Sequence, residues 1–386
     1  MEYRLEEIFD LQMGKTPSRN NPDYWNTMDN KWISIADLSK CGKYIVNTKE
    51  YLSEQAVEES GISQIPENTV VMSFKLSIGK TAITPEPMYS NEAIMSFRDK
   101  KVVDILPDYI FYMFSGKDWD EGTNKAVMGK TLNKATLSKI KVNIPDMESQ
   151  RKVVEVLDKV SCIIADRRSE LEKLNNLIKS RFVELFGDPV VNSMSWAEEL
   201  IGDSCFVTKL AGFEYTQYIH YEDSGDVVMV KAQNVKNGKL NRKDLSYISN
   251  EVSDSLPRSQ LAVGDVVMTY VGANIGDVAV IDGEYKYHLA PNVAKIRPNA
   301  EKYNSIYFMY MMMFLNSYIV GNSADTAKAA LGMERIRKLK VFVPPIELQN
   351  QFAAFFEQTD KLKVEVQKSL DETQTLFDSL MQEYFG

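Results

Sequence analysis

The sequence contains few of the residues from which disulfide frameworks and metal centres are built. Its 386 residues include three cysteines and two histidines, scattered along the chain. They are Cys41, Cys162, Cys205, His220 and His288. Paired cysteines, or cysteine and histidine in ligand spacing, mark disulfide-rich and zinc-binding domains. The sequence therefore predicts neither a disulfide scaffold nor a metal site.

Long apolar segments and a leader sequence are also lacking. The most apolar run, Ile306–Val320, is shorter than the roughly 20 residues that cross a bilayer, and it contains Asn316 and Ser317. The first residues do not show the basic, apolar and small-residue zones of a signal peptide. The length of 386 residues and the hydrophobic content of 44% are enough for the cores of more than one domain. From the lack of a leader, a membrane-spanning segment and a disulfide framework, we expect a soluble, cytoplasmic protein.

The composition lacks the basic excess that usually marks nucleic-acid-binding proteins. The net charge is −9, which argues mildly against such a function. It does not exclude one, because local patches matter more than the total charge. Acidic residues are concentrated in residues 340–386, where eight Asp or Glu stand against four Lys or Arg. This acidic segment indicates a protein partner.

What the sequence does contain is an internal repeat. Residues 141–187 align without a gap with residues 340–386, at a constant offset of 199 residues. Both copies contain a Pro-x-x-Glu-x-Gln segment, at Pro145–Gln150 and Pro344–Gln349, and both end in Phe-Gly. A period this long indicates two copies of a whole domain-plus-helix unit rather than a solenoid.

The repeat extends upstream, with small insertions and deletions. Val70–Ser73 matches Val266–Thr269, and Ser77–Gly79 matches Asn274–Gly276. The side chains that keep their type are mostly apolar residues and glycines, whereas those that change are mostly polar and lie between predicted strands. One scaffold is therefore expected to carry two different surfaces.

Each globular part has the pattern of an α+β domain. Short β-prone segments such as Lys31–Ile35, bounded by Gly, Pro, Asn or Asp, are typical of strands. Pro107–Ser115 and Ser305–Tyr318 predict helices that pack on the sheet. We expect globular domains at residues 1–140 and 188–339, and long helices at residues 141–187 and 340–386.

Apolar residues in the first long helix recur at alternating spacings of four and three, interrupted at Arg167 and Arg181, which is the pattern of a coiled coil. The second helix keeps this pattern less strictly, with Thr359, Lys363 and Thr373 in the seam. About 38 residues give a rod of roughly 55–60 Å, which is longer than one small domain. A bundle helix packed on its own domain remains an alternative. We expect an antiparallel pair of helices, related by a pseudo-two-fold, that separates two similar domains. Its seam is expected to comprise Val153, Leu157, Val160, Leu171, Leu174, Phe352, Phe356, Val366 and Leu370.

A domain, a Pro-x-x-Glu-x-Gln entry into a long helix and a Phe-Gly exit, all present twice, resemble the specificity subunit of a Type I restriction–modification system. The resemblance covers essentially the whole chain, and Leu210–Thr216 also looks like a recurring form of the second domain. It implies that each globular part is a target recognition domain that reads one half of a bipartite sequence in double-stranded DNA.

The same resemblance implies the partners. The helices would set the length of the unread spacer and carry two methyltransferase (modification) subunits, with restriction subunits added in a full system. S-adenosylmethionine would be bound by the methyltransferase, and no cofactor by this chain. The alternative is a two-domain coiled-coil scaffold that docks proteins through its loops and never reads DNA.

No residue pattern predicts catalysis by the chain itself. The Gly-Lys-Thr triplets at Gly14, Gly79 and Gly129 lack the glycine five positions earlier that a phosphate-binding P-loop needs. Asn21–Tyr24 is close to the Asn-Pro-Pro-Tyr signature of amino-methyltransferases, but polar residues precede it and Asp23 replaces the second proline. We therefore expect any enzyme activity to belong to partner subunits.

Loop residues that differ between the two copies are the candidates for DNA binding. Arg and Lys suit guanine, Asn and Gln suit adenine, and phosphate contacts position the protein. In the first domain the candidates are Gln12, Lys15, Thr16, Ser18, Arg19, Ser73, Lys75, Ser77, Lys80, Lys130 and Asn133. In the second domain they are Lys209, Phe213, Tyr215, Thr216, Lys231, Gln233, Asn234, Tyr270, Asn274 and Lys328.

Overall fold

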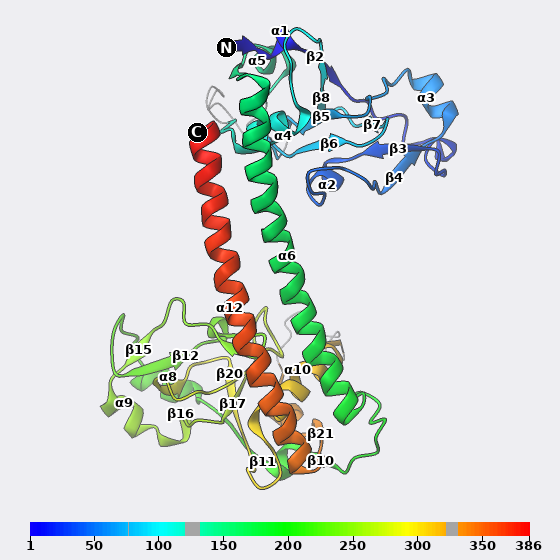
Figure 1. The fold of residues 1–386 in the computed structure, drawn as a ribbon. Coiled ribbons are helices and arrows are strands. Elements are labelled where there is room, and N and C mark those ends of the chain that lie inside the picture. Colours follow the sequence, from blue (N-terminus) through cyan, green and yellow to red (C-terminus); the bar gives the residue numbers. More distant parts are fainter. Residues whose placement is uncertain (76, 120–131, 322–330) are drawn as a thin grey trace. The chain divides into compact units, whose positions relative to one another are not determined.

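The computed structural model describes residues 1–75, 77–119, 132–321 and 331–386 (Figure 1). The chain divides into two compact units. Unit 1 comprises Met1–Arg168 and Lys368–Gly386, and unit 2 comprises Ser169–Gln367. Each unit therefore takes in part of both long helices, α6 (Met147–Phe186) and α12 (Ile346–Phe385).

Unit 1 contains two main sheets. The first is antiparallel, in the order β2 (Phe9–Met13), β8 (Ile94–Asp99), β5 (Thr69–Ser73), β6 (Thr81–Thr84). The second has the order β4 (Glu50–Leu52), β3 (Asn30–Ile33), β7 (Tyr89–Ser90). Helix α4 (Pro107–Gly116) packs on β5 and β6. The short pair β1 (Glu2–Arg4) and β9 (Lys141–Asn143) precedes α6. The short helices are α1 (Leu5–Ile8), η1 (Pro22–Tyr24), α2 (Ile35–Leu38), α3 (Glu54–Ser60) and α5 (Lys134–Ser138).

Unit 2 repeats this order of elements. Its antiparallel sheet is β11 (Cys205–Lys209), β20 (Val293–Pro298), β17 (Val266–Thr269), β18 (Val278–Val280). Its mixed sheet is β15 (Tyr247–Ile248), β12 (Val227–Val230), β19 (Lys286–Leu289), β16 (Gln260–Leu261). Helix α10 (Ser305–Gly321) packs on β17 and β18, and β10 (Glu198–Leu200) pairs with β21 (Lys340–Phe342). The short helices are α7 (Ile201–Ser204), α8 (Gly212–Tyr218), η2 (Ala232–Asn234), α9 (Asn250–Ser255), η3 (Pro257–Ser259) and α11 (Met333–Arg337). The predicted α+β fold with an internal repeat is confirmed.

The hairpin of β13 (Val235–Lys236) and β14 (Lys239–Leu240) is where the units differ most, because no such hairpin occurs in the described part of unit 1. In unit 1 the corresponding chain follows α2 as a loop without strands. The scaffold is thus kept while a connection between strands changes.

The glutamine of each Pro-x-x-Glu-x-Gln segment anchors the first turn of its helix. Gln150 is fully buried; its Nε2 donates to the carbonyl oxygens of Asp104 and Pro145, both at 2.9 Å, and its Oε1 accepts from the Leu106 amide at 2.9 Å. Gln349 is equally buried. Its Nε2 donates to the carbonyl oxygens of Lys302 and Pro344, at 2.9 and 2.7 Å, and its Oε1 accepts from the Asn304 backbone amide at 2.9 Å. Because a buried amide needs all its hydrogen bonds, the motif binds each helix to the loop before α4 or α10.

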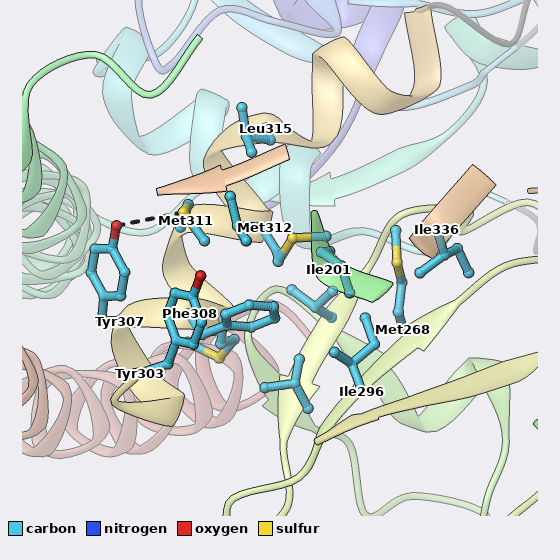
Figure 2. Packing of buried hydrophobic residues seen from close by; sticks show 14 of the residues in the cluster. Ile201, Met268, Ile296, Tyr303, Tyr307, Phe308, Met311, Met312, Leu315 and Ile336 are labelled. Atoms are coloured by element: carbon cyan, nitrogen blue, oxygen red, sulfur yellow. Dashed lines mark hydrogen bonds between the residues drawn. The ribbon is translucent and has the colours of Figure 1, made fainter. Parts of the chain in front are cut away.

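The ends of the long helices belong to the cores of the domains. In unit 2, Phe182 and Phe352 lie with ring centroids 5.2 Å apart, and Phe186 lies 4.6 Å from Tyr307 of α10. In unit 1, Phe385 of α12 lies 5.4 Å from Tyr109 of α4. Figure 2 shows part of the unit 2 core, with α10 side chains packed beside those of the sheet. The helical segments of each unit run antiparallel (Figure 1).

This packing corrects one expectation about the seam. Leu157, Val160, Val366 and Leu370 are buried, while Leu171, Leu174 and Phe356 are half-buried along the same faces. Val153 and Phe352, however, pack into the domain cores of units 1 and 2. They lie near the start of each helix, where the Gln anchor holds the helix against its domain. The seam residues are therefore shared between helix pairing and domain docking.

Replacing His288 with Gln is expected to reduce the loss of stability at low pH. His288 is fully buried, and its Nδ1 lies 3.0 Å from the Leu289 carbonyl oxygen. Burial lowers its pKa from 6.5, so unfolding takes up a proton and stability is lost as the pH falls below about 6.5. This residue contributes up to about 1.4 kcal/mol per pH unit in that range. Thermal unfolding at pH 7.5 and 5.5 measures the effect, and His220→Gln, at an exposed histidine, is the control. If the His288→Gln variant lost as much stability between these pH values as the wild-type protein, the prediction would be wrong.

Candidate nucleic-acid interface

Two loops of unit 1 meet around Glu92. The hydroxyl of Thr16, which follows β2, donates to the Glu92 carboxylate. This hydrogen bond, and the charges of Lys75 and Arg19, hold the pKa of Glu92 below its usual value. Thr16, Arg19 and Lys75 therefore lie in one neighbourhood although 59 residues separate Thr16 from Lys75 in the sequence. The fold brings together candidates from separate loops.

Lys75 and Lys80 lie at the β5–β6 turn, and their ammonium groups are candidates for contact with a phosphate. Within the described residues of unit 1, neither side chain makes an ion pair. The Lys75 ammonium lies 5.4 Å from the centre of the Phe74 ring, and Lys80 is exposed. A cation without a carboxylate partner can contact a phosphate without first breaking an ion pair.

Other candidates in unit 1 are engaged within the domain. The Arg19 guanidinium lies 3.7 Å from the Trp25 ring centre and pairs with Glu50. Lys15 donates to the Ser60 carbonyl oxygen, and Gln12 donates to the Ser63 hydroxyl at 2.5 Å. These contacts order the loop that follows β2. The Ser18 side chain is exposed, and its carbonyl oxygen accepts from the Trp25 indole at 3.1 Å.

Two candidates prove to be interior residues, which corrects the prediction for both. Ser73 is fully buried; its hydroxyl donates to the Ser77 carbonyl oxygen at 2.6 Å and accepts from the Lys80 amide at 3.1 Å. Asn234 is 2% exposed, and its Nδ2 donates to the carbonyl oxygens of Asn241 and Lys243. Their polar atoms satisfy the backbone of the loops, so they shape these loops and do not face a ligand.

Several candidates have local roles or lie outside the described residues. The Asn133 side chain caps α5 by accepting from the Thr136 amide at 2.8 Å. Thr216 donates to the Gly212 and Phe213 carbonyl oxygens within α8. Ser77 is exposed in the β5–β6 turn, with a positive φ of 56°. Lys130 and Lys328 lie outside the described residues.

In unit 2, Lys209 at the end of β11 meets Tyr270, which follows β17; both strands pair with β20 in the antiparallel sheet. The Lys209 ammonium lies 5.4 Å from the centre of the Tyr270 ring. Asn274 is exposed in the turn from β17 to β18, which is closed by Gly276 with φ of 87°. The corresponding turn of unit 1 is closed by Gly79 with φ of 88°, a conformation that suits glycine. The same turn thus presents different side chains in the two units.

A second group of unit 2 combines aromatic rings with polar side chains, and we call it the aromatic–basic surface: Phe213, Tyr215, Tyr221, Lys231 and Gln233. Phe213 is 67% exposed, and the rings of Tyr215 and Tyr221 lie 6.0 Å apart. The Lys231 ammonium lies 5.9 Å from the Tyr221 ring and donates to the Ser246 hydroxyl at 2.9 Å. Gln233 is exposed, with only a long 3.5 Å contact to the Asp244 carbonyl oxygen. An exposed glutamine can read an adenine edge, and an exposed aromatic ring such as that of Phe213 can contact a thymine methyl group.

The sequence analysis missed Tyr221. It precedes β12 in a polar stretch, rich in turn-forming residues, that shows no repeat, and only its contacts with Tyr215 and Lys231 reveal its place. Burial, followed by the interaction with Tyr215, raises its pKa, so its ring stays neutral. Its aromatic character was the one signal that could have placed it among the candidates.

The motifs that resembled nucleotide and methyl-donor sites are used in local structure. The Asn21 side chain accepts from the Asp23 amide at 3.2 Å and caps η1, and Tyr24 donates to Glu59. At Gly14, a Cβ would lie 2.1 Å from the Ser90 carbonyl oxygen, so close backbone approach requires the glycine there. The part of the chain that the structure describes holds no group of three or more His, Cys, Asp or Glu side chains arranged for a metal ion. Among the same residues, no helix has the length and apolarity to cross a membrane.

Two similar α+β units with different loop surfaces, each joined to a long helix by a buried glutamine, define a duplicated recognition protein. The family model of the Type I restriction modification DNA specificity domain matches residues 1–175 and 202–373. The chain belongs to this family.

Its relatives in this family are specificity subunits. The Type I restriction enzyme MjaIX specificity subunit of Methanocaldococcus jannaschii is 22% identical, over 98% of this chain and 90% of its own length. The EcoprrI specificity subunit of Escherichia coli is 22% identical, over 93% of this chain and 87% of its own.

Solved structures share the fold. The crystal structure of the S subunit of the Type I restriction-modification system from M. genitalium has a TM-score of 0.61 at 12% identity, and the match covers 100% of this chain and 96% of that one. A chain from work on complex assembly and conformational transition of the type I R-M system has a TM-score of 0.58 at 15% identity, with coverage of 100% and 97%.

Proposed function

We propose that this chain gives a Type I restriction–modification complex its DNA sequence specificity and catalyses no reaction itself. Unit 1 and unit 2 each read one half of a bipartite target, and the paired helices set the unread spacer. The family match over both units, together with one scaffold that carries two different loop surfaces, is the observation that supports this function. S-adenosylmethionine belongs, in this proposal, to the partner methyltransferase, and the complex acts in the cytoplasm.

Base reading in unit 2 is assigned to the aromatic–basic surface, and in unit 1 to the neighbourhood of Glu92 together with the β5–β6 turn. Lys75, Lys80 and Lys209 then serve as phosphate contacts, because lysines that make no ion pair with the described residues can contribute affinity without reading bases. Arg19 and Lys15 order the loop that follows β2.

The proposal gives each unit a docking site for one methyltransferase copy. Unit 1 exposes Ile163 of α6 and Leu376 of α12, by 45% and 51%. Unit 2 exposes Leu362 of α12 and Leu177 of α6, by 52% and 49%. The offset of 199 residues relates Ile163 to Leu362 and Leu177 to Leu376, so the two units expose apolar residues at equivalent positions with the helices exchanged. Two equivalent sites suit two copies of one partner.

Modified-base sequencing tests the function directly. DNA is compared from cells that express this chain with its neighbouring methyltransferase subunit and from cells that lack only this chain. A bipartite motif methylated only when the chain is present supports the proposal and gives both half-sites. With an active methyltransferase, absence of chain-dependent methylation would refute the proposal and favour the protein-docking scaffold.

Replacing Gln233 with Ala is expected to relax one base position in one half-site. Its amide is exposed and, among the residues that the structure describes, makes only a long 3.5 Å contact, so it can pair with a base edge. Loss of such a contact costs about 1–3 kcal/mol at that position. Methylation of a target library with single-base changes measures it, and the half-site read by unit 1 is the internal control. An unchanged preference at every position would remove Gln233 from the reading set.

A further inference from the structure

A lysine in unit 1 joins the globular domain to the side of α6. Lys43, in the loop after α2, has its Nζ 2.5 Å from Asp108 Oδ1 on α4 and 2.7 Å from Asp158 Oδ1 on α6. Tyr112 of α4 donates to Asp158 at 2.5 Å, and Tyr44 donates to Asp108 at 2.8 Å. The Lys43 side chain is 17% exposed, whereas the side chains of Asp108 and Asp158 are 27% and 45% exposed, so the lysine is the most screened member of the network.

Unit 2 has a lysine at the corresponding place. Lys239 of the β13–β14 hairpin has its Nζ 2.7 Å from Asp360 Oδ1 on α12. The backbone beside each lysine makes the same isolated parallel bridge: Tyr44 with Ile83 of β6, and Gly238 with Ala279 of β18. The loops that follow β3 and β12 differ in structure, yet both bring a lysine to an aspartate on the following helix. We call Lys43 and Lys239 the lysine struts.

Each strut lies away from the glutamine anchor on the same helix. Asp158 follows Gln150 by eight residues and Asp360 follows Gln349 by eleven, which correspond to about 12 and 16 Å along a helix. A domain held to a rod near a single point can rock about that point, whereas a second attachment removes this freedom. The strut therefore extends the attachment of each domain along its helix, beyond the anchor and the apolar packing beside it, and restrains the angle of the domain.

We propose that Lys43 and Lys239 are positioning residues that set the angle of each recognition domain on its helix and thereby the spacing between half-sites that the protein accepts. This inference rests on the proposed function. At the offset of 199 residues, Asp360 corresponds to Ser161 and not to Asp158, so the second strut reaches about one turn further along its helix. The two domains therefore have separately adjustable angles.

The test uses the complex of the full chain with its methyltransferase subunit. Methylation rates are compared on duplexes that carry the native half-sites with the native spacer, or with one base pair added or removed. Lys239→Met and Asp360→Asn are each expected to reduce the preference for the native spacer about fivefold, the effect of a lost ion pair worth about 1 kcal/mol. The double variant should lose no more than Asp360→Asn alone, because Lys239 acts through Asp360, which also faces Lys363.

Lys236→Met is the matched control, since it removes the same charge from an exposed site on the same hairpin. In unit 1, Lys43→Met and the milder Tyr112→Phe are expected to shift spacing in the same way. Lower thermal stability with an unchanged spacing preference in all these variants would overturn the inference. Failure of the wild-type complex to methylate any specific sequence would instead refute the proposed function.

Discussion

Replacing Ile163 and Leu362 together with glutamate is expected to release both methyltransferase copies from the chain. These residues occupy equivalent positions in the two units, and each is about half exposed. Burying an unpaired carboxylate at the centre of an apolar contact costs more than about 2 kcal/mol, at least a thirtyfold loss of affinity. Light scattering of the purified complex measures how many copies remain bound.

Each single variant provides a stricter version of this experiment. Ile163→Glu should remove the copy docked on unit 1, and Leu362→Glu the copy docked on unit 2, so each leaves one copy bound. Val263→Glu is the control, because Val263 is 73% exposed in unit 2 and lies outside the long helices. Retention of both copies by the double variant would show that the partner docks elsewhere.

Replacing Phe352 with Ala is expected to destabilise unit 2 by about 3–5 kcal/mol. The ring is fully buried, with centroids 5.2 Å from Phe182, 5.8 Å from Phe186 and 5.2 Å from Tyr310. Its removal leaves a cavity among side chains of α6, α10 and α12, which the rigid helices cannot close. Hydrogen exchange of the whole chain should accelerate in α10 while the unit 1 sheet is little changed.

Phe213→Ala is the matched control for this substitution. Phe213 is 67% exposed, so its loss should change stability by less than about 0.5 kcal/mol. A cost below about 1 kcal/mol for Phe352→Ala would mean that the aromatic cluster does not hold the helices to the domain.

The fold was predictable because the repeat preserves the residues that build it. Val70–Ser73 and Val266–Thr269 keep their apolar pattern, and both form central strands of antiparallel sheets with the same order. The division into units was not predictable, because the heptad pattern marks an apolar face without saying what covers it. Phe352, for example, has the spacing of a seam residue, but its ring contacts Tyr310 of α10 as well as Phe182 and Phe186 of α6.

The candidate site was predictable only at the level of loops. The polarity of Ser73 and Asn234 suggested exposure, but backbone groups surround both side chains and use their hydrogen-bonding capacity. Whether a polar side chain makes such hydrogen bonds depends on the tertiary structure and cannot be predicted from the type of residue. The converse applies to Tyr221, whose place beside Lys231 depends on the path of a loop. The glutamines that recur in the two copies of the repeat, Gln150 and Gln349, were visible as a motif, and the structure shows that each is buried and hydrogen-bonded to the loop before α4 or α10.

The division of the chain has a consequence for how the protein is made. Unit 1 is completed by Lys368–Gly386, whose Phe385 ring packs on Tyr109 of α4. Those residues leave the ribosome after the whole of unit 2, so the first domain to emerge waits longest for its last contacts. Closure across so many intervening residues is slow compared with local folding. Until translation reaches that segment, the aromatic face of α4 is uncovered and is a natural target for a chaperone.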